Sequence, residues 1–232
     1  MTTTTTQPET RTAPSHDAIY GAATAEPEEG CFYIPLAEFG QSLDNPDLDV
    51  WFEAFVARNK HFSGGFFEIT AEGELKIMPP TGLPGYWQET GFAAILWMWA
   101  DGYGGKAGGP TGRFRMPDGS RPGPDAIWIS DERWNAATEE ERRPPFAAIA
   151  PDFICEIVSP SNRGPELVRK VELFIANGTR LAWIINPERR LATIYRPGRD
   201  PETLVDPETL DGEDVLPGFV FEVRARIFDN VG

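Results

Sequence analysis

The sequence is poor in cysteine and histidine, and it has no long apolar run. Among its 232 residues there are two cysteines, Cys31 and Cys155, and two histidines. Two cysteines form neither a disulfide framework nor the paired spacing of a zinc site, so the composition fits a reducing cytoplasm. Even the apolar stretch AAILWMWA at 93–100 is much shorter than the roughly twenty residues that span a membrane. We therefore expect no membrane partner.

Basic residues are also scarce. The chain carries 21 Lys and Arg against 36 Asp and Glu, which gives a formal net charge of -15. Proteins that bind nucleic acid usually present a basic stripe, and that stripe supplies much of their affinity. Here the arginines form local pairs, at 113 and 115, 142 and 143, and 189 and 190. The net acidity therefore disfavours DNA as a partner without excluding it.

Two of these arginine pairs are predicted to lie in different kinds of structure, one in a strand and one in a turn. Arg113 and Arg115 alternate along a predicted strand just before Asp125, so both point to one face, either to contact phosphate or as a surface ladder. Arg189 and Arg190 are predicted to lie in a hairpin turn, because the strand-like runs LAWIIN and LATIYRP flank them.

Residues 1–28 differ in composition from the rest of the chain. They are rich in Thr, Ala, Pro and Glu and lack an apolar periodicity, which predicts a disordered tail. A basic segment followed by an apolar segment is missing, so the tail is not read as a signal peptide. Residues 29–232 are long enough to form one domain with one good core.

Two carboxylates fall inside or beside short apolar runs that read as buried strands. Glu156 lies in FICEIVSPS, where Ile154 and Val158 share its face, and Asp125 opens PDAIWIS. A buried carboxylate is costly unless it is paired or holds a cation, so the two favour a metal site. Asp152 stands at the entry to the Glu156 strand, where a turn or strand cap is the simpler interpretation.

A helix is predicted after the Glu156 strand, from Pro165 to the residues before Gly178. Its apolar stripe is Leu167, Val171 and Phe174, and Lys170 lies at the margin of the stripe. The Lys170 stem is placed to run over the core toward the strand end. The alternative is a surface lysine with a solvated ammonium, as most helix lysines are.

Further elements complete the expected order. Helices are predicted over Asp47 to Asn59, over WQETGFAAILWMWA at 87–100, and near Ala136 to Arg142. A hairpin is predicted through 66–80, and a last strand at LPGFVFEV, 216–223. The helix at 87–100 is apolar nearly all round, which favours burial against the sheet or a partner subunit, so we expect a homodimer.

Asp on one strand, Glu on the next and a nearby Lys resemble the site of PD-(D/E)xK nucleases. From about Gly65 to the C-terminus the chain resembles the Uma2 (DUF820) family of restriction-endonuclease-like proteins. The segments that carry this resemblance are MPPTG at 78–82, PDAIWIS at 124–130 with ERW at 132–134, PDFICEIVSPSNR at 151–163, the Lys170 helix, NGTRLAWIINPERRLATIYRPG at 177–198 and DVLPGF at 214–219. The resemblance implies an α/β fold, a restriction-endonuclease-like mixed β-sheet flanked by helices.

The resemblance also implies a site. Asp125, Glu156 and the backbone carbonyl of Ile157 would be the metal ligands, and oxygen ligands suit magnesium or manganese. Lys170 would orient the attacking water or stabilise the transition state. The chain departs from the nuclease signature because Val158 stands where the motif lysine is expected. Glu89 is the nearest carboxylate on the 87–100 helix for completing the site; the alternative is a solvated residue in its first turn.

Three functions are compatible with these residues. The first is a metal-dependent endonuclease that hydrolyses phosphodiester bonds in DNA. The second is a catalytically silent protein that keeps the nuclease fold for binding, which Val158 and the acidic surface favour. The third is a hydrolase of small phosphate esters, because one small anion can enter a site that repels duplex DNA.

Overall fold

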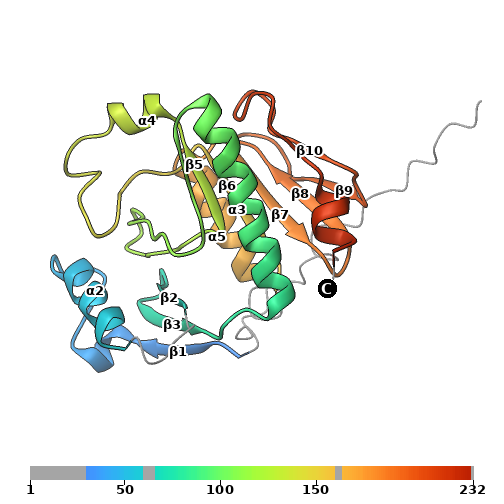
Figure 1. The fold of residues 1–232 in the computed structure, drawn as a ribbon. Helices are drawn as coiled ribbons and strands as arrows, with labels where there is room; N and C mark the ends of the chain where they lie inside the picture. The colour runs from blue at the N-terminus through green and yellow to red at the C-terminus, as the bar shows by residue number, and fades with distance from the viewer. Residues whose placement is uncertain (1–29, 60–65, 160–163, 231–232) are drawn as a thin grey trace, which may run out of the picture.

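The computed structural model describes residues 30–59, 66–159 and 164–230, and a six-stranded mixed sheet forms its centre (Figure 1). In spatial order the strands are β4 (Lys106–Gly108), β5 (Ala126–Ile129), β6 (Phe153–Ile157), β7 (Leu181–Asn186), β8 (Leu191–Tyr195) and β9 (Glu202–Val205). β6 and β7 pair in parallel, because helix α5 (Pro165–Ala176) connects them across the sheet. The other neighbouring strands are antiparallel.

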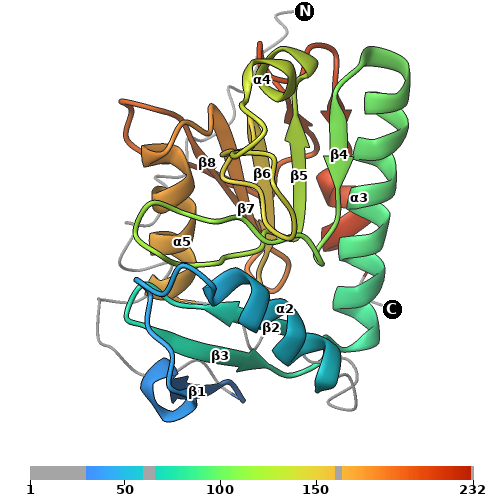
Figure 2. The same ribbon diagram turned by 90° about the vertical axis from the view of Figure 1, so that its left-hand side faces the viewer.

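One helix covers each face of this sheet, α3 (Leu83–Tyr103) on one side and α5 on the other (Figure 2). The alternation of side chains along β6 assigns its residues to the two faces. Phe153 and Cys155 belong to the core under α3, whereas Ile154 belongs to the core under α5. Glu156, two residues after Ile154, is therefore on the α5 face.

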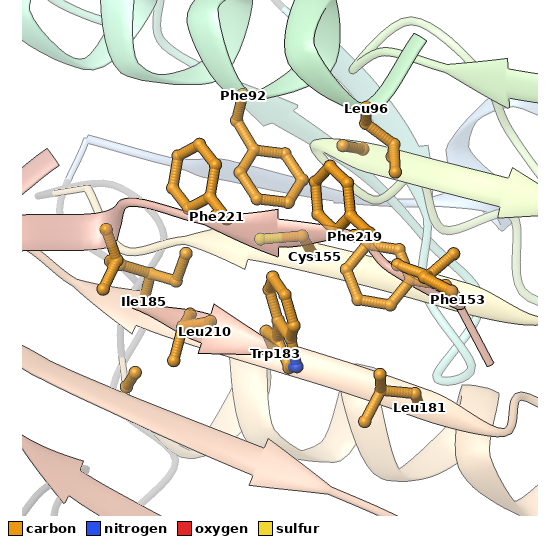
Figure 3. Packing of buried hydrophobic residues seen from close by; sticks show 14 of the residues in the cluster. Phe92, Leu96, Phe153, Cys155, Leu181, Trp183, Ile185, Leu210, Phe219 and Phe221 are labelled. Carbon is orange, nitrogen blue, oxygen red and sulfur yellow. The ribbon is translucent and has the colours of Figure 1, made fainter. Parts of the chain in front are cut away.

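The core under α3 is aromatic (Figure 3). Phe92 of α3 lies with its ring 4.7 Å from that of Phe221, and Phe153 lies 4.9 Å from Trp183, both edge to face. The C-terminal segment closes this core with β10 (Leu210–Asp211), β11 (Val220–Phe221) and η2 (Arg224–Phe228). Because these rings are large and fully packed, α3 is fixed along its inner side.

Residues before α3 form a second layer, a small sheet with two helices packed on it. Strands β1 (Phe32–Pro35), β3 (Glu74–Met78) and β2 (Phe66–Ile69) form an antiparallel sheet in that order. The short helix η1 (Leu36–Phe39) and the helix α2 (Leu48–Arg58) pack on it. An ion pair of 2.7 Å between Lys76 of β3 and Glu166 of α5 ties this layer to the main body.

The architecture confirms the expected mixed sheet with flanking helices, but two predicted elements are wrong. Residues 113–116 are not a strand; Phe114 makes an isolated bridge with Ala147. No helix covers 137–142, because α4 (Asp131–Ala136) starts earlier and ends at Ala136. The Ser130 hydroxyl accepts a hydrogen bond from the Arg133 N–H and sets the start of α4.

Two further predictions, on the N-terminal tail and on membrane spans, can be compared with the structure only over the residues that it describes. The predicted tail, 1–28, lies outside them. Among the residues described, no helix is long and apolar enough to cross a bilayer.

Candidate active site

Asp125 and Glu156 lie on adjacent strands at the same end of the main sheet. The β5–β6 ladder pairs Ala126 with Cys155. One step further in this antiparallel register sets Asp125 opposite Glu156, and directly opposed residues have Cβ atoms roughly 5 Å apart. The Ile157 N–H donates to Asp125 Oδ2 at 2.7 Å, which fixes that carboxyl against the end of β6.

Lys170 reaches this strand end from α5. Its Nζ lies 2.8 Å from Glu156 Oε1 and donates to the Gly123 carbonyl at 2.8 Å, and it lies 3.2 Å from Glu68 Oε1. An ammonium has three N–H donors, so these three acceptors can take them all. The Lys170 side chain is 13 % exposed and Glu156 is fully covered. The interpretation of Lys170 as a solvated surface lysine is therefore wrong.

Glu68 on β2 is a residue that sequence reasoning missed. Its side chain is buried and accepts a hydrogen bond of 2.8 Å from the Gly123 N–H. Burial acts to raise its pKa, but Lys170, Arg113 and Lys76 outweigh burial and lower the pKa to about 2. In the sequence, Glu68 is a carboxylate between two core residues of a hairpin strand. Because successive side chains of a strand point to opposite faces, this pattern predicts that Glu68 faces solvent. Packing of the hairpin against α5 buries it instead.

Glu89 also faces the site. The helix α3 begins at Leu83, so Glu89 lies in its second turn, and it is buried. The alternative of a solvated first-turn residue is therefore wrong. Burial raises the pKa of Glu89, and Glu156 raises it further, while a hydrogen bond from Thr81 and the charge of Lys170 oppose the rise. The neighbouring Gln88 instead donates to the Ile227 carbonyl at 3.1 Å.

The electrostatics of Asp125 show that these carboxyl groups repel one another. Burial raises its pKa well above the ordinary value, and Glu156 and Glu89 raise it further; Lys170 and the Ile157 N–H only partly oppose them. One ammonium thus compensates several neighbouring carboxylates. A bound cation would relieve this repulsion.

A small cavity of about 40 Å³ opens at this strand end. Asp125, Glu89, Glu68 and Lys170 line it, whereas the fully buried Glu156 does not. Such a volume is enough for a water or an ion, since a cavity of roughly 10–15 Å³ on this measure already holds one water. Glu68 and Lys170 also line a larger cleft of about 520 Å³ beside α5.

The oxygen donors at the strand end are of the kind that a hard divalent cation needs. In the described ranges, no three His, Cys, Asp or Glu side chains are grouped to hold a metal by themselves. Mg²⁺ is usually held by one or two carboxylates, with water and substrate oxygens completing its shell. Asp125 and Glu156 meet that requirement in type. Asp125 lines the cavity, whereas Glu156 is covered and pairs with Lys170, and the mutual repulsion of the carboxyl groups favours a cation. The residues therefore fit a hard divalent ion.

The two arginines before Asp125 do not share a face as expected. Arg113 lines the small cavity, where its Nε donates to the Phe67 carbonyl at 2.8 Å. Arg115 turns away and pairs with Asp49 at 3.1 Å. Without a strand at 113–116 there is no shared face, so the prediction that both point the same way is wrong.

The other residues singled out in the sequence have structural partners. Asp152 is buried, accepts from the Ser130 N–H at 2.8 Å and pairs with Arg133 at 2.9 Å. It is a strand-entry anchor, as expected. Arg190 lies in the β7–β8 turn with a positive φ of 54° and pairs with Asp206 and Asp229.

Comparisons with known proteins identify the family and the fold of the chain. The family model of Uma2, described as "Putative restriction endonuclease", matches residues 52–224. A solved structure described as a "putative nuclease belonging to DUF820" from Anabaena variabilis ATCC 29413 is similar with a TM-score of 0.62 and 18 % identity. The similarity covers 72 % of this chain and 91 % of that one, and at this identity it shows the fold. A search of curated proteins found no match.

Proposed function

Because the chain belongs to the Uma2 family, we propose that it is a metal-dependent endonuclease that hydrolyses phosphodiester bonds in DNA. The observation that carries the proposal is the convergence of Asp125, Glu156, Glu89 and Lys170 at one strand end. A scaffold without chemistry would gain stability by replacing this repelling, buried set with apolar residues.

The proposed ligands are Asp125, Glu156 and the backbone carbonyl of Ile157, with Mg²⁺ or Mn²⁺ as the ion. When bound, the ion would neutralise charge on a phosphate and lower the pKa of a coordinated water. The Ile157 N–H holds Asp125 in place through its 2.7 Å hydrogen bond. The strand end thus presents its carboxyl groups in a fixed orientation.

Lys170 has the role of a charged hydrogen-bond donor. Burial acts to lower its pKa, but Glu156, Glu68 and Asp125 outweigh burial and raise it, so the ammonium keeps its proton. It can donate to the attacking water or to a phosphate oxygen, but it cannot act as a base. Glu89, whose pKa is raised, is the better group to exchange a proton with that water.

Substrate entry requires Lys170 to exchange an acceptor. Its three contacts, to Glu156, Glu68 and the Gly123 carbonyl, occupy its donors in this state. Because Glu156 is a proposed metal ligand, its contact with Lys170 is the one expected to lengthen. The ammonium would then be free to turn to a phosphate oxygen while Glu68 and Gly123 still hold it.

The test is a cleavage assay on supercoiled plasmid, single-stranded DNA and RNA, with and without Mn²⁺. We expect the parent to cut DNA only with the metal, and Asp125→Asn to lose that activity. Asp101→Asn is the matched control, because Asp101 is exposed near the other end of α3. Absence of cleavage in every condition, or equal cleavage by Asp125→Asn, would contradict the proposal.

A hydrolase of small phosphate esters is the second candidate. It is favoured by the small cavity at the carboxylates and by the acidic lining of the larger cleft, which includes Glu72, Glu74 and Asp118. This lining would repel a duplex more than it repels one small anion. Metal-dependent hydrolysis of a nitrophenyl phosphodiester without any DNA cleavage would favour this candidate over an endonuclease.

A further inference from the structure

The outer side of α3 is an unusually apolar surface. Figures 1 and 2 show α3 along the outside of the molecule, with no described element on its outward side. Trp97 is 56 % exposed and Met98 70 %, and near the start of the helix Leu83, Tyr86 and Trp87 are each more than half exposed. Between Leu83 and Ala100 the one charged residue is Glu89, which is buried at the candidate site, and the exposed Asp101 follows near the end of the helix.

The area of this surface reaches the size of a specific interface. An aromatic side chain buries roughly 150–250 Å², so five side chains that are about half exposed offer on the order of 500 Å². Two copies that cover each other would bury about 1,000 Å², the lower size of specific protein–protein interfaces. A patch of several hundred Å² on a monomer is at the upper end of what soluble proteins expose.

The order of residues along this surface is self-complementary. Gly91 and Ala94 are small and exposed at its centre, and Trp87 and Met98 lie at equal distances in sequence on either side of them. A two-fold axis between Gly91 and Ala94 sets Trp87 of one helix against Met98 of an antiparallel second helix. The small central residues let two helix axes approach closely, and a sulfur against an aromatic ring is a favourable contact.

We propose that the outer side of α3 is the interface of a two-fold symmetric dimer, in which a second copy of this chain packs its α3 antiparallel to the first. The scarcity of charge on this side, where Asp101 at one end is the exposed charged residue of α3, matters because the molecule as a whole carries -15. Two copies that meet through a more acidic surface would bring more like charges together than two copies that meet through this side. Residues 1–29 contain few large apolar side chains, namely Met1, Ile19 and Tyr20, and are poorly suited to cover the surface.

Sedimentation equilibrium of the full chain, from low to high micromolar concentration, tests this proposal. We expect a dimer, and we expect Trp97→Glu to raise its dissociation constant about 100-fold or more, because the variant buries an unpaired charge at an aromatic anchor. Val205→Glu is the control, since Val205 is exposed on the edge strand β9. A monomeric parent would overturn the proposal, and so would dissociation by Val205→Glu with Trp97→Glu still dimeric.

The variant Gly91→Gln tests the interface without disturbing the fold of the monomer. A Cβ at Gly91 meets no atom within 4 Å, and glutamine is the better helix former, so the melting temperature should not fall. The added side chain blocks close approach of a second helix, and the dimer should weaken at least tenfold. Unchanged dimerisation of this variant would overturn the antiparallel packing. Dimerisation only after removal of residues 1–28 would show that the N-terminal segment covers the surface and would also overturn it.

Discussion

The ammonium of Lys170 sets the charge balance of the site. It is the foremost of the charges that lower the pKa of Glu68, and it helps to limit the rise at Asp125 and Glu89. The same group pairs with the fully buried Glu156 at 2.8 Å. Loss of this charge therefore has consequences for stability as well as for chemistry.

Lys170→Met is expected to abolish metal-dependent cleavage while the chain still folds. Without metal, the free energy of unfolding should fall by about 3–5 kcal/mol, because removal of one partner leaves buried carboxylates uncompensated. Cleavage assays and urea unfolding measure the two effects. Arg169→Met, at the exposed neighbouring position of α5, is the control and should change neither. Cleavage by Lys170→Met at the parent rate would show that the helix lysine does not replace the motif lysine.

Glu68→Gln gives a pH-dependent loss of stability. The pKa of Glu68 is about 2 in the folded protein against the usual 4.5, so its stabilisation is present above pH 4.5 and is lost as the pH falls toward 2. A shift of this size corresponds to roughly 3 kcal/mol. We expect the variant to be less stable by about that amount near neutral pH, and the difference to shrink in acid.

Urea unfolding at neutral and acidic pH measures this difference, with Glu72→Gln in the exposed β2–β3 turn as the control. A destabilisation of Glu68→Gln that stays constant with pH would contradict an electrostatic role for Glu68.

At the scale of elements, the site joins two strands of one sheet to helices on both of its faces. β5 and β6 bring Asp125 and Glu156 together through their register, α5 supplies Lys170 and α3 supplies Glu89. The lysine thus comes from a helix rather than from β6. Val158, two residues after Glu156, packs with the core under α5 and so is directed to the same side as Lys170.

Val158→Lys combined with Lys170→Met tests whether strand and helix positions are equivalent. We expect the double variant to recover part of the metal-dependent cleavage lost in Lys170→Met, because a long lysine stem can cover the apolar core and still reach the strand end. Plasmid nicking with Mn²⁺ compares the double variant with both single variants. If the double variant folds but stays as inactive as Lys170→Met, the two positions are not interchangeable.

Elements with a strong local pattern were predictable from the sequence. The strands around Glu156, the α5 helix between Pro165 and Gly178, and the β7–β8 hairpin have clear periodicity or end signals. The expected strand at 113–116 failed because RMPDGSRPG is rich in Pro and Gly and folds into turns. The helix expected at 136–142 failed because the Ser130 cap, which starts α4, went unnoticed.

The candidate site was predictable only in part, because much of it is tertiary. Asp125 and Glu156 were recognisable from the nuclease-like motif, and Lys170 from its place beside the apolar stripe of its helix. The structure brings the three residues together. Glu68 was not, since its burial depends on β2 packing against a helix about a hundred residues away. Local sequence carries no signal for such a contact.

At the scale of the whole molecule, the remaining expectation concerns the contribution of the N-terminal segment to stability. Residues 1–28 contain few large apolar side chains, so we expect this segment to contribute little to the free energy of unfolding. Their deletion is therefore expected to leave the melting temperature nearly unchanged. Differential scanning calorimetry of the parent and the shortened chain measures this, and a large fall would show that the segment contributes to the fold.

Binding of Mn²⁺ tests the central claim, that the carboxylates at the strand end form a metal site. Isothermal titration calorimetry of the parent should show Mn²⁺ binding that Asp125→Asn abolishes and that the control Asp101→Asn retains. Because the pKa of Asp125 is raised, the affinity should increase as the pH rises and this carboxyl loses its proton. No binding by the parent, or equal binding by Asp125→Asn, would contradict the account and favour a catalytically silent protein of the same fold.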